Sequence, residues 1–149
     1  MIIVKVPGIN GNNESRNSGN AILKELERVV NSKGKTIDSQ TLALEEIHVN
    51  NDKLDEQDKL IYENSLDLFS EQDKTIFLGG DNSLSYSTIS AFFDSSPGFV
   101  LIFDRLLDID KYSDIPGNKS WLKALIERYN SSNILVVGAS EALDKEFFN

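Results

Sequence analysis

The sequence predicts an α/β fold: a doubly wound, three-layer domain with helices on both faces of a parallel sheet of about five strands. Two observations predict it. Short runs of β-branched and aromatic residues alternate with helical patterns, which is typical of successive βαβ units. The run FVLIF at 99–103 is apolar throughout, as in strands that parallel sheets bury on both faces. We treat residues 1–149 as one domain, because a chain of this length can bury a single core.

The first part of the chain contains two predicted strands and two predicted helices. The run IIVKV at 2–6 is the first strand, and a loop rich in Gly and Asn follows it. Apolar residues at helical spacing predict a helix over 22–30 that ends by Gly34. Residues 41–49 are a weaker strand candidate. A long acidic helix comes next, and one apolar stripe marks its buried face: Leu54, Ile61 and Leu68.

The second part continues the alternation, as parallel strands joined by crossover helices require. Its predicted elements, in order, are strand 74–78, helix 84–93, strand 99–103, helix 121–129, strand 134–137 and a short terminal helix at 141–148. The helix at 121–129 carries an apolar stripe that includes Trp121, which we therefore assign to the core.

Composition excludes several classes of function. The formal net charge of −9 argues against a nucleic-acid partner, because phosphate binding needs a basic face. The absence of cysteine excludes disulfides, thiolate zinc sites and cysteine nucleophiles. No apolar run approaches the ~20 residues of a membrane helix, and Pro7-Gly8 stops the short apolar start before it could serve as a signal peptide. We expect a cytoplasmic protein without a membrane partner.

Polar residues follow two of the predicted strands where each one ends. Ligands of parallel sheets bind outside the carboxyl ends of the strands, here at 7–13, 79–83, 104–110 and 138–141. The second and third of these segments hold five polar side chains that could ligate a hard cation: Asp81, Asn82, Asp104, Asp108 and Asp110. For Asn82 and Ser83 we favour helix capping instead, since both residue types are preferred N-caps.

The segments LGGDNS and FDRLLDID resemble the first half of the arginase/agmatinase (ureohydrolase) family, whose members carry GGDHS after one strand and DAHxD after the next. The segments SWLKALIE and VVGAS also fall where that family has a helix and a strand. The resemblance covers most of this chain but about half of a typical family member. It implies an arginase-like sheet of eight strands, in which the last two separate the third from the fourth. Without those two, we expect strand 74–78 to pair directly with strand 99–103, which gives the order 2-1-3-4-5.

The resemblance also implies two manganese ions bridged by a hydroxide that attacks a guanidinium carbon. Carried over by position, the family's first histidine ligand falls on Asn82 and its second on Leu106, while two aspartate ligands fall on Asp104 and Asp108. The family's later pair of aspartates has no counterpart before Asn149. We therefore expect Asp104 and Asp108 to be vestigial metal ligands and expect no catalytic residue and no cofactor. The vestigial cleft at the strand ends comprises Gly80, Asp81, Asn82, Ser83, Asp104 and Asp108.

Without a metal, the two aspartates would repel each other. At a separation of ~4 Å and an effective dielectric constant near 20, the repulsion costs about 4 kcal/mol. We expect Asp104 and Asp108 to diverge into solvent. The alternatives are a bound cation or pairing with a nearby base: Arg105, Lys111 or Lys119. The single histidine, His48, lies among polar residues of a different strand, and we expect it to be exposed and without function.

Three functions remain open. The leading hypothesis is a shortened, catalytically inactive ureohydrolase-like domain, a pseudoenzyme with a structural, regulatory or interaction role, acting through a homodimer or another protein. The first alternative is a Mn²⁺-dependent hydrolase of guanidino or amidine C–N bonds, completed by another subunit. The second is a small-molecule module that binds an amine or guanidinium at the strand-end cleft, with the negative charge of Asp81, Asp104 and Asp108.

Overall fold

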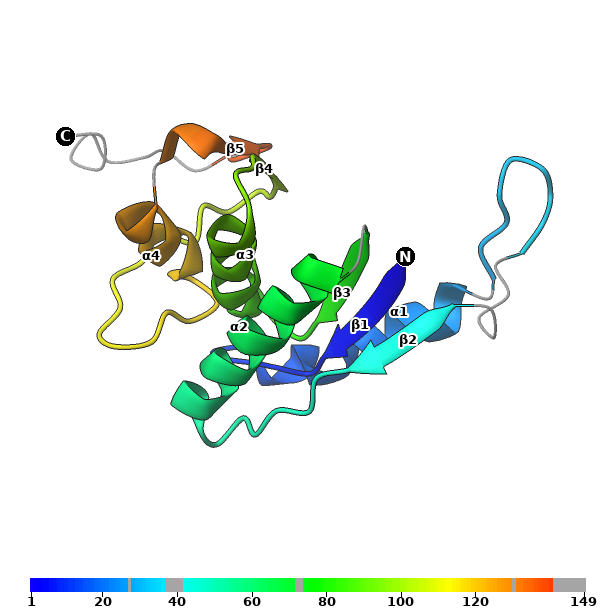
Figure 1. Ribbon diagram of the computed structural model, residues 1–149, viewed down its shortest axis with the longest axis horizontal. Helices are drawn as coiled ribbons and strands as arrows, with labels where there is room; N and C mark the ends of the chain where they lie inside the picture. The colour runs from blue at the N-terminus through cyan, green and yellow to red at the C-terminus, as the bar shows by residue number, and fades with distance from the viewer. Residues whose placement is uncertain (27, 37–41, 72–73, 130, 141–149) are drawn as a thin grey trace.

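The computed structural model describes residues 1–26, 28–36, 42–71, 74–129 and 131–140. Within these residues the fold is α/β, with parallel strands that alternate with helices (Figure 1). Two short 3-10 helices, η1 (Asn13–Asn17) and η3 (Ser131–Asn133), precede α1 and β5. The strands and α-helices are, in chain order, β1 (Ile2–Val6), α1 (Ser18–Leu26), β2 (Ala43–Glu46), α2 (Leu54–Glu71), β3 (Thr75–Gly79), α3 (Leu84–Ser95), β4 (Val100–Phe103), α4 (Trp121–Arg128) and β5 (Ile134–Val137).

The first three strands form a parallel sheet in the order β2-β1-β3. Because side chains alternate between the two faces of a strand, Val4 and Val6 share one face of β1 and Lys5 lies on the other. The first face packs against α2, where Ile61 and Leu68 belong to the same buried cluster. The second face meets α1, in which Gly19 lies against Leu78 of β3. Helices therefore cover both faces, as the three-layer prediction requires.

Strands β4 and β5 form a second parallel sheet of two strands. Its inner face, which carries Ile102 and Val136, packs against Leu122 and Leu125 of α4. Helix α3 adds Tyr86, Ile89 and Phe93 to this second core. Figure 1 shows the two sheets apart, with α3 next to the β4–β5 pair and α2 between α3 and the first sheet.

The single strand order 2-1-3-4-5 is not confirmed, because the pairing of β3 with β4 that it requires is not present in the described residues. Strands that pair in a sheet lie ~4.8 Å apart, and β3 and β4 are not paired in this way in the described residues. Instead, the two strands belong to different cores: Leu84 of α3 joins the cluster under β1, whereas Phe93 of the same helix joins the cluster under β4. Two parts of the predicted order are present: β2-β1-β3 in the first sheet and β4-β5 in the second.

The prediction that strand 99–103 is buried on both faces is wrong. Leu101 is 48% exposed and Phe103 is 75% exposed, and Phe99, which precedes β4, is 57% exposed. Only the alternate side chains of β4 face a helix layer. The apolar run reflects a strand with one packed face and, in the described part of the chain, one uncovered face.

Most other elements agree with the sequence to within a few residues. The first helix differs: it spans Ser18–Leu26, and Val29 and Val30 lie beyond it and are about half exposed. A bridge between Val30 and Thr36 takes the place of the predicted helix end. The predicted terminal helix at 141–148 lies outside the described residues. Among the helices that are described, none combines the length and the apolar character needed to cross a membrane.

Candidate functional site

The loop after β1 lies against the turn between β3 and α3. Gly80 permits this contact, because a Cβ atom at that position would lie 2.1 Å from the carbonyl oxygen of Gly8. The Asp81 N–H donates to the same oxygen at 3.3 Å. A side chain at position 80 would force the two backbones apart, so glycine is needed here for close approach.

The Asp81 carboxylate holds these two segments together. Its Oδ2 accepts hydrogen bonds from the backbone N–H groups of Asn10 and Asn12, at 3.0 and 2.9 Å. Its Oδ1 accepts from the backbone N–H and the hydroxyl of Ser83. Asp81 is 7% exposed and Ser83 is 3% exposed. Both oxygens of this buried carboxylate are therefore occupied by the protein itself, and the role of Asp81 is structural.

Asn82 connects the ends of β3 and β4. Its side-chain Nδ2 donates to Oδ2 of Asp108 at 2.9 Å and to Oδ2 of Asp104 at 3.4 Å. Both partners are carboxylate oxygens, which can only accept, so the NH₂ group of the amide must face them. An amide thus lies between the two carboxylates and reduces the repulsion that would otherwise separate them.

Asp108 has a second donor that the sequence did not reveal. The Trp121 Nε1–H donates to the same Oδ2 at 2.8 Å, and both residues are buried. Asp108 adopts a left-handed backbone conformation, with φ of 50°. Asp104 accepts at Oδ1 from the backbone N–H of Leu106 at 3.0 Å. The general signal for Trp121 is that a buried indole N–H needs an acceptor, but the sequence alone does not say which one.

Several expectations for these residues were wrong. Asp104 and Asp108 do not diverge into solvent but converge on Asn82. The side chains of Asn82 and Ser83 do not cap α3; Ser83 is the N-cap residue by position, without a side-chain capping bond. Within the described chain, no base forms an ion pair with either aspartate; the bases considered were Arg105, Lys111 and Lys119.

His48 is remote from this cluster, as expected. Its side chain is 85% exposed and lies 3.4 Å from Glu46. Among the described residues, no group of three or more His, Cys, Asp or Glu side chains is placed to hold a metal ion.

Two hollows lie near the loop after β1. The larger, of about 470 Å³, opens beside the ends of β1 and β2 and has a polar lining that includes Asn13, Arg16 and Asp52. None of the six predicted cleft residues lines it. The smaller has a volume of about 10 Å³, which is room for about one water molecule.

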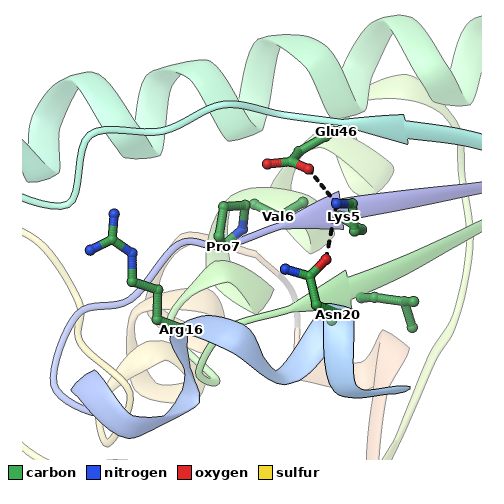
Figure 2. A pocket seen from close by; sticks show the side chains of 8 residues that line it. Lys5, Val6, Pro7, Arg16, Asn20 and Glu46 are labelled. Carbon is green, nitrogen blue, oxygen red and sulfur yellow. Dashed lines mark hydrogen bonds and ion pairs between the residues drawn. The ribbon is translucent and has the colours of Figure 1, made fainter. Parts of the chain in front are cut away.

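The smaller hollow surrounds an ion pair between Lys5 and Glu46 (Figure 2). The Lys5 ammonium also donates to Asn20 Oδ1 at 3.0 Å, and this hydrogen-bonded lysine holds the pKa of the Glu46 carboxyl below its usual value. Figure 2 shows Arg16 pointing away from this pair. Lys5 and Glu46 neutralise each other, and the hollow leaves room for no ligand larger than a water molecule, so we regard it as structural.

Comparison with known proteins decides the family. A sequence model of the arginase family matches residues 9–148, which is almost the whole chain. The chain belongs to the arginase family. No curated protein matches its sequence.

Solved structures of arginase-family proteins share the fold. A formimidoylglutamase from Bacillus subtilis superposes with a TM-score of 0.74 at 18% identity, over 99% of this chain and 50% of that one. The proclavaminate amidino hydrolase of Streptomyces clavuligerus gives 0.78 at 15% identity, over 99% and 54%. A formiminoglutamase from Trypanosoma cruzi, solved with Mn²⁺, gives 0.69 at 19% identity, over 93% and 52%. The chain spans about half the length of these structures.

The strand-end residues of this chain do not fit the pair of manganese ions that the family resemblance implies. A two-metal site needs ions ~3.5–4 Å apart, held by bridging carboxylates and further ligands. Here Asn82 directs a hydrogen-bond donor, not an acceptor, between Asp104 and Asp108. At position 106 a leucine supplies only its backbone N–H to the cluster. Two carboxylates, together with an amide whose NH₂ group faces them, supply too few ligand atoms for two metal ions.

Proposed function

We propose that this protein is a non-catalytic member of the arginase family with a structural, regulatory or interaction role. One observation carries the proposal: the Asn82 amide donates to both Asp104 and Asp108 at the ends of β3 and β4. The two hydrogen bonds that this amide donates satisfy two carboxylates that would otherwise need a cation. The cluster therefore stabilises the folded chain in place of activating a nucleophile.

The rest of the cluster supports this interpretation. The Asp108 oxygen that accepts from Asn82 also accepts from the indole of Trp121. Asp81 is fully engaged by the loop after β1. Ser83 and Asp81 bond each other, and no described histidine lies near enough to activate the serine hydroxyl. Nucleophilic and general-base roles thus have no free group among these residues.

The proposal is tested by assaying the purified chain with arginine and with agmatine in Mn²⁺, using urea release as the readout. We expect no urea above a metal-free blank. An active arginase in the same buffer is the positive control. Metal-dependent urea release by the isolated chain would overturn the proposal. A thermal stabilisation by agmatine, without any response to Mn²⁺, would favour the guanidinium-binding alternative.

A second candidate is a Mn²⁺-dependent hydrolase of guanidino or amidine C–N bonds that another subunit completes. The unpaired edges of β3 and β4, which lie on either side of the Asn82 cluster, favour it. A strand with an open edge is a template for pairing with another chain. Urea release that appears only when a second protein is added would support this candidate over the first.

We further propose that the protein associates with itself. The outer face of the β4–β5 sheet carries four large apolar side chains that are 42–75% exposed: Leu101, Phe103, Leu135 and Val137. In the register of the two strands, Leu101 lies beside Leu135 and Phe103 beside Val137, so the patch is continuous. Contiguous apolar patches of this kind mark interaction surfaces.

A further inference from the structure

A separate cavity lies within the helical layer, away from the strand ends. Its volume is about 190 Å³, and residues of three helices line it: Asp58 and Tyr62 of α2, Tyr86, Ser87 and Ser90 of α3, and Arg128 of α4. Pockets for drug-sized ligands usually measure about 300–1,000 Å³. A ligand of this cavity must therefore be small.

Asp58 is the one lining side chain whose charge has no counter-ion in the described part of the chain. Among the described residues, its side chain accepts one hydrogen bond, from the Ser87 hydroxyl at 2.9 Å to Oδ1. Burial raises the pKa of the Asp58 carboxyl, the bond from Ser87 opposes that shift, and Asp55 adds to it. A partly buried carboxylate without a cation is costly, and a bound cation would relieve this cost.

The two basic residues of the lining are already paired. Arg128 forms an ion pair with Asp94 at 3.1 Å and lies over the rings of Tyr62 and Tyr129, 5.9 and 5.1 Å from their centroids. Lys59, which also lines the cavity, lies 3.8 Å from Glu63. The unmatched charge of the cavity is therefore negative.

Ser90 provides an independent sign of a missing partner. It is fully buried, it lines the cavity, and its hydroxyl has no hydrogen-bond partner. Buried hydroxyls normally find one, because an unmade hydrogen bond costs about 1–3 kcal/mol. Because this oxygen has almost no accessible surface, a polar group in the cavity reaches it after a shift of the Ser90 side chain.

We propose that this cavity binds a small primary ammonium ion, with its charged nitrogen at the Asp58 carboxylate. Its carbon stem packs against the rings of Tyr62 and Tyr86, which supply apolar surface in the lining. An anion is disfavoured by the unmatched negative charge. A divalent metal is disfavoured because one carboxylate and two serine hydroxyls fall short of the six or more oxygens that Ca²⁺ takes, and the phenol oxygens of Tyr62 and Tyr86 are already bonded to Asp94 and Arg128.

The test titrates the isotopically labelled full chain with n-butylammonium chloride and follows backbone amide signals by two-dimensional NMR. Butanol, which has the same stem without the charge, is the ligand control. We expect saturable shifts at Ser87 and Ser90 with half-saturation at about 1 mM. We expect butanol to bind at least about tenfold more weakly. Equal responses to the two compounds, or shifts that rise linearly without saturation, would overturn the proposal.

Two variants, Asp58→Asn and Asp55→Asn, test which carboxylate binds the ammonium group. We expect Asp58→Asn to weaken butylammonium binding by about tenfold or more, because it removes the carboxylate and keeps the side-chain shape. Asp55→Asn removes a charge one turn away on the same helix, at an exposed position that does not line the cavity. It should leave binding within about twofold. Equal weakening by both variants would mean a diffuse electrostatic effect and would contradict the site. If Asp58→Asn does not fold, the comparison of butylammonium with butanol on the unmodified chain still tests the proposal.

Discussion

Asn82 gives the strand-end cluster its chemistry. At the equivalent position the family motif has a histidine, whose ring nitrogen could ligate a metal, whereas an amide nitrogen can only donate. The two donated bonds join the turn after β3 to the segment after β4. At the scale of single residues, therefore, we propose that an amide donor forms a structural crosslink at the position where the family resemblance implies a metal ligand.

We predict that Asn82→Asp destabilises the protein by about 1–2 kcal/mol at neutral pH, because it replaces two donated hydrogen bonds with a third carboxylate. Chemical denaturation followed by circular dichroism measures this change. Asn13→Asp is the matched control, since Asn13 is exposed and its side chain forms no hydrogen bond with another described residue. Equal stability of the two variants would show that the Asn82 bonds contribute nothing.

Trp121 is the second donor to Asp108, and we predict a coupling of about 1 kcal/mol between them. A double-mutant cycle with Trp121→Phe and Asp108→Asn measures it by equilibrium unfolding. The cycle subtracts the cavity that the smaller ring leaves, because that cavity is present in both backgrounds. Strictly additive effects would argue against a stabilising bond between the indole and the carboxylate.

At the scale of elements, Tyr129 joins α3 to α4. Its hydroxyl lies 3.2 Å from the carbonyl oxygen of Ser90 and 2.9 Å from Oδ2 of Asp94. Burial is the largest cause that raises the pKa of this phenol, to about 12, and the bond to Asp94 adds to it. The neutral phenol is therefore favoured in the folded state relative to the unfolded state, in which its pKa is about 10.

It follows that the contribution of Tyr129 to stability is complete below about pH 10 and is lost as the pH rises toward about 12. We predict that Tyr129→Phe flattens this alkaline decline in melting temperature. Tyr112 has a similarly raised pKa, through its bond to Glu127, and Tyr112→Phe removes that second contribution separately. An unchanged alkaline decline in Tyr129→Phe would contradict the assignment.

The elements themselves were largely predictable, because hydrophobic periodicity indicates which segments form strands and which form helices. Ile61 and Leu68, predicted as one stripe of a helix, are both buried against β1. The sequence failed where tertiary context decides. Val29 and Val30 continue a helical pattern, yet the helix ends at Leu26 and both side chains are about half exposed. Apolar spacing alone does not show whether a surface exists for these side chains to pack against.

For the strand-end cluster, position was predictable and contacts were not. The sequence placed Asp81 and Asn82 after β3 and Asp104 and Asp108 after β4, and in the structure Asn82 contacts both Asp104 and Asp108 although the two strands belong to different sheets. Which way an amide faces, or that Trp121 reaches Asp108, depends on the packing of α4 against β4. No pattern along the chain encodes that geometry.

At the scale of the whole molecule, the described residues form two sheets and two cores joined through α3. The prediction of one continuous sheet assumed that the simplest crossover would close the gap between β3 and β4. The helix that connects them instead divides its apolar side chains between the two cores. Both sheets therefore keep an open edge in the described residues, and the β4–β5 sheet also keeps an open face.

This open face leads to a prediction about assembly. We expect light scattering coupled to size-exclusion chromatography to show a concentration-dependent homodimer, because burial of the apolar patch is favourable. Phe103→Lys should shift the mass to that of the monomer, since it places a charge in the centre of the interface. Leu60→Lys, at a 39% exposed position on α2, is the control and should leave the dimer intact. A monomer at every concentration would refute the prediction.

If a hydrogen-bonded amide stands where the family resemblance implies a metal centre, the unmodified chain does not bind Mn²⁺ there, and a Mn²⁺ titration measures this. Free Mn²⁺ is counted by electron paramagnetic resonance as metal is added to the purified protein. We predict no saturable binding at micromolar Mn²⁺, because Asp104 and Asp108 are engaged by Asn82 and Trp121. Two equivalents of Mn²⁺ bound per chain, lost in Asp104→Asn and Asp108→Asn, would contradict the account.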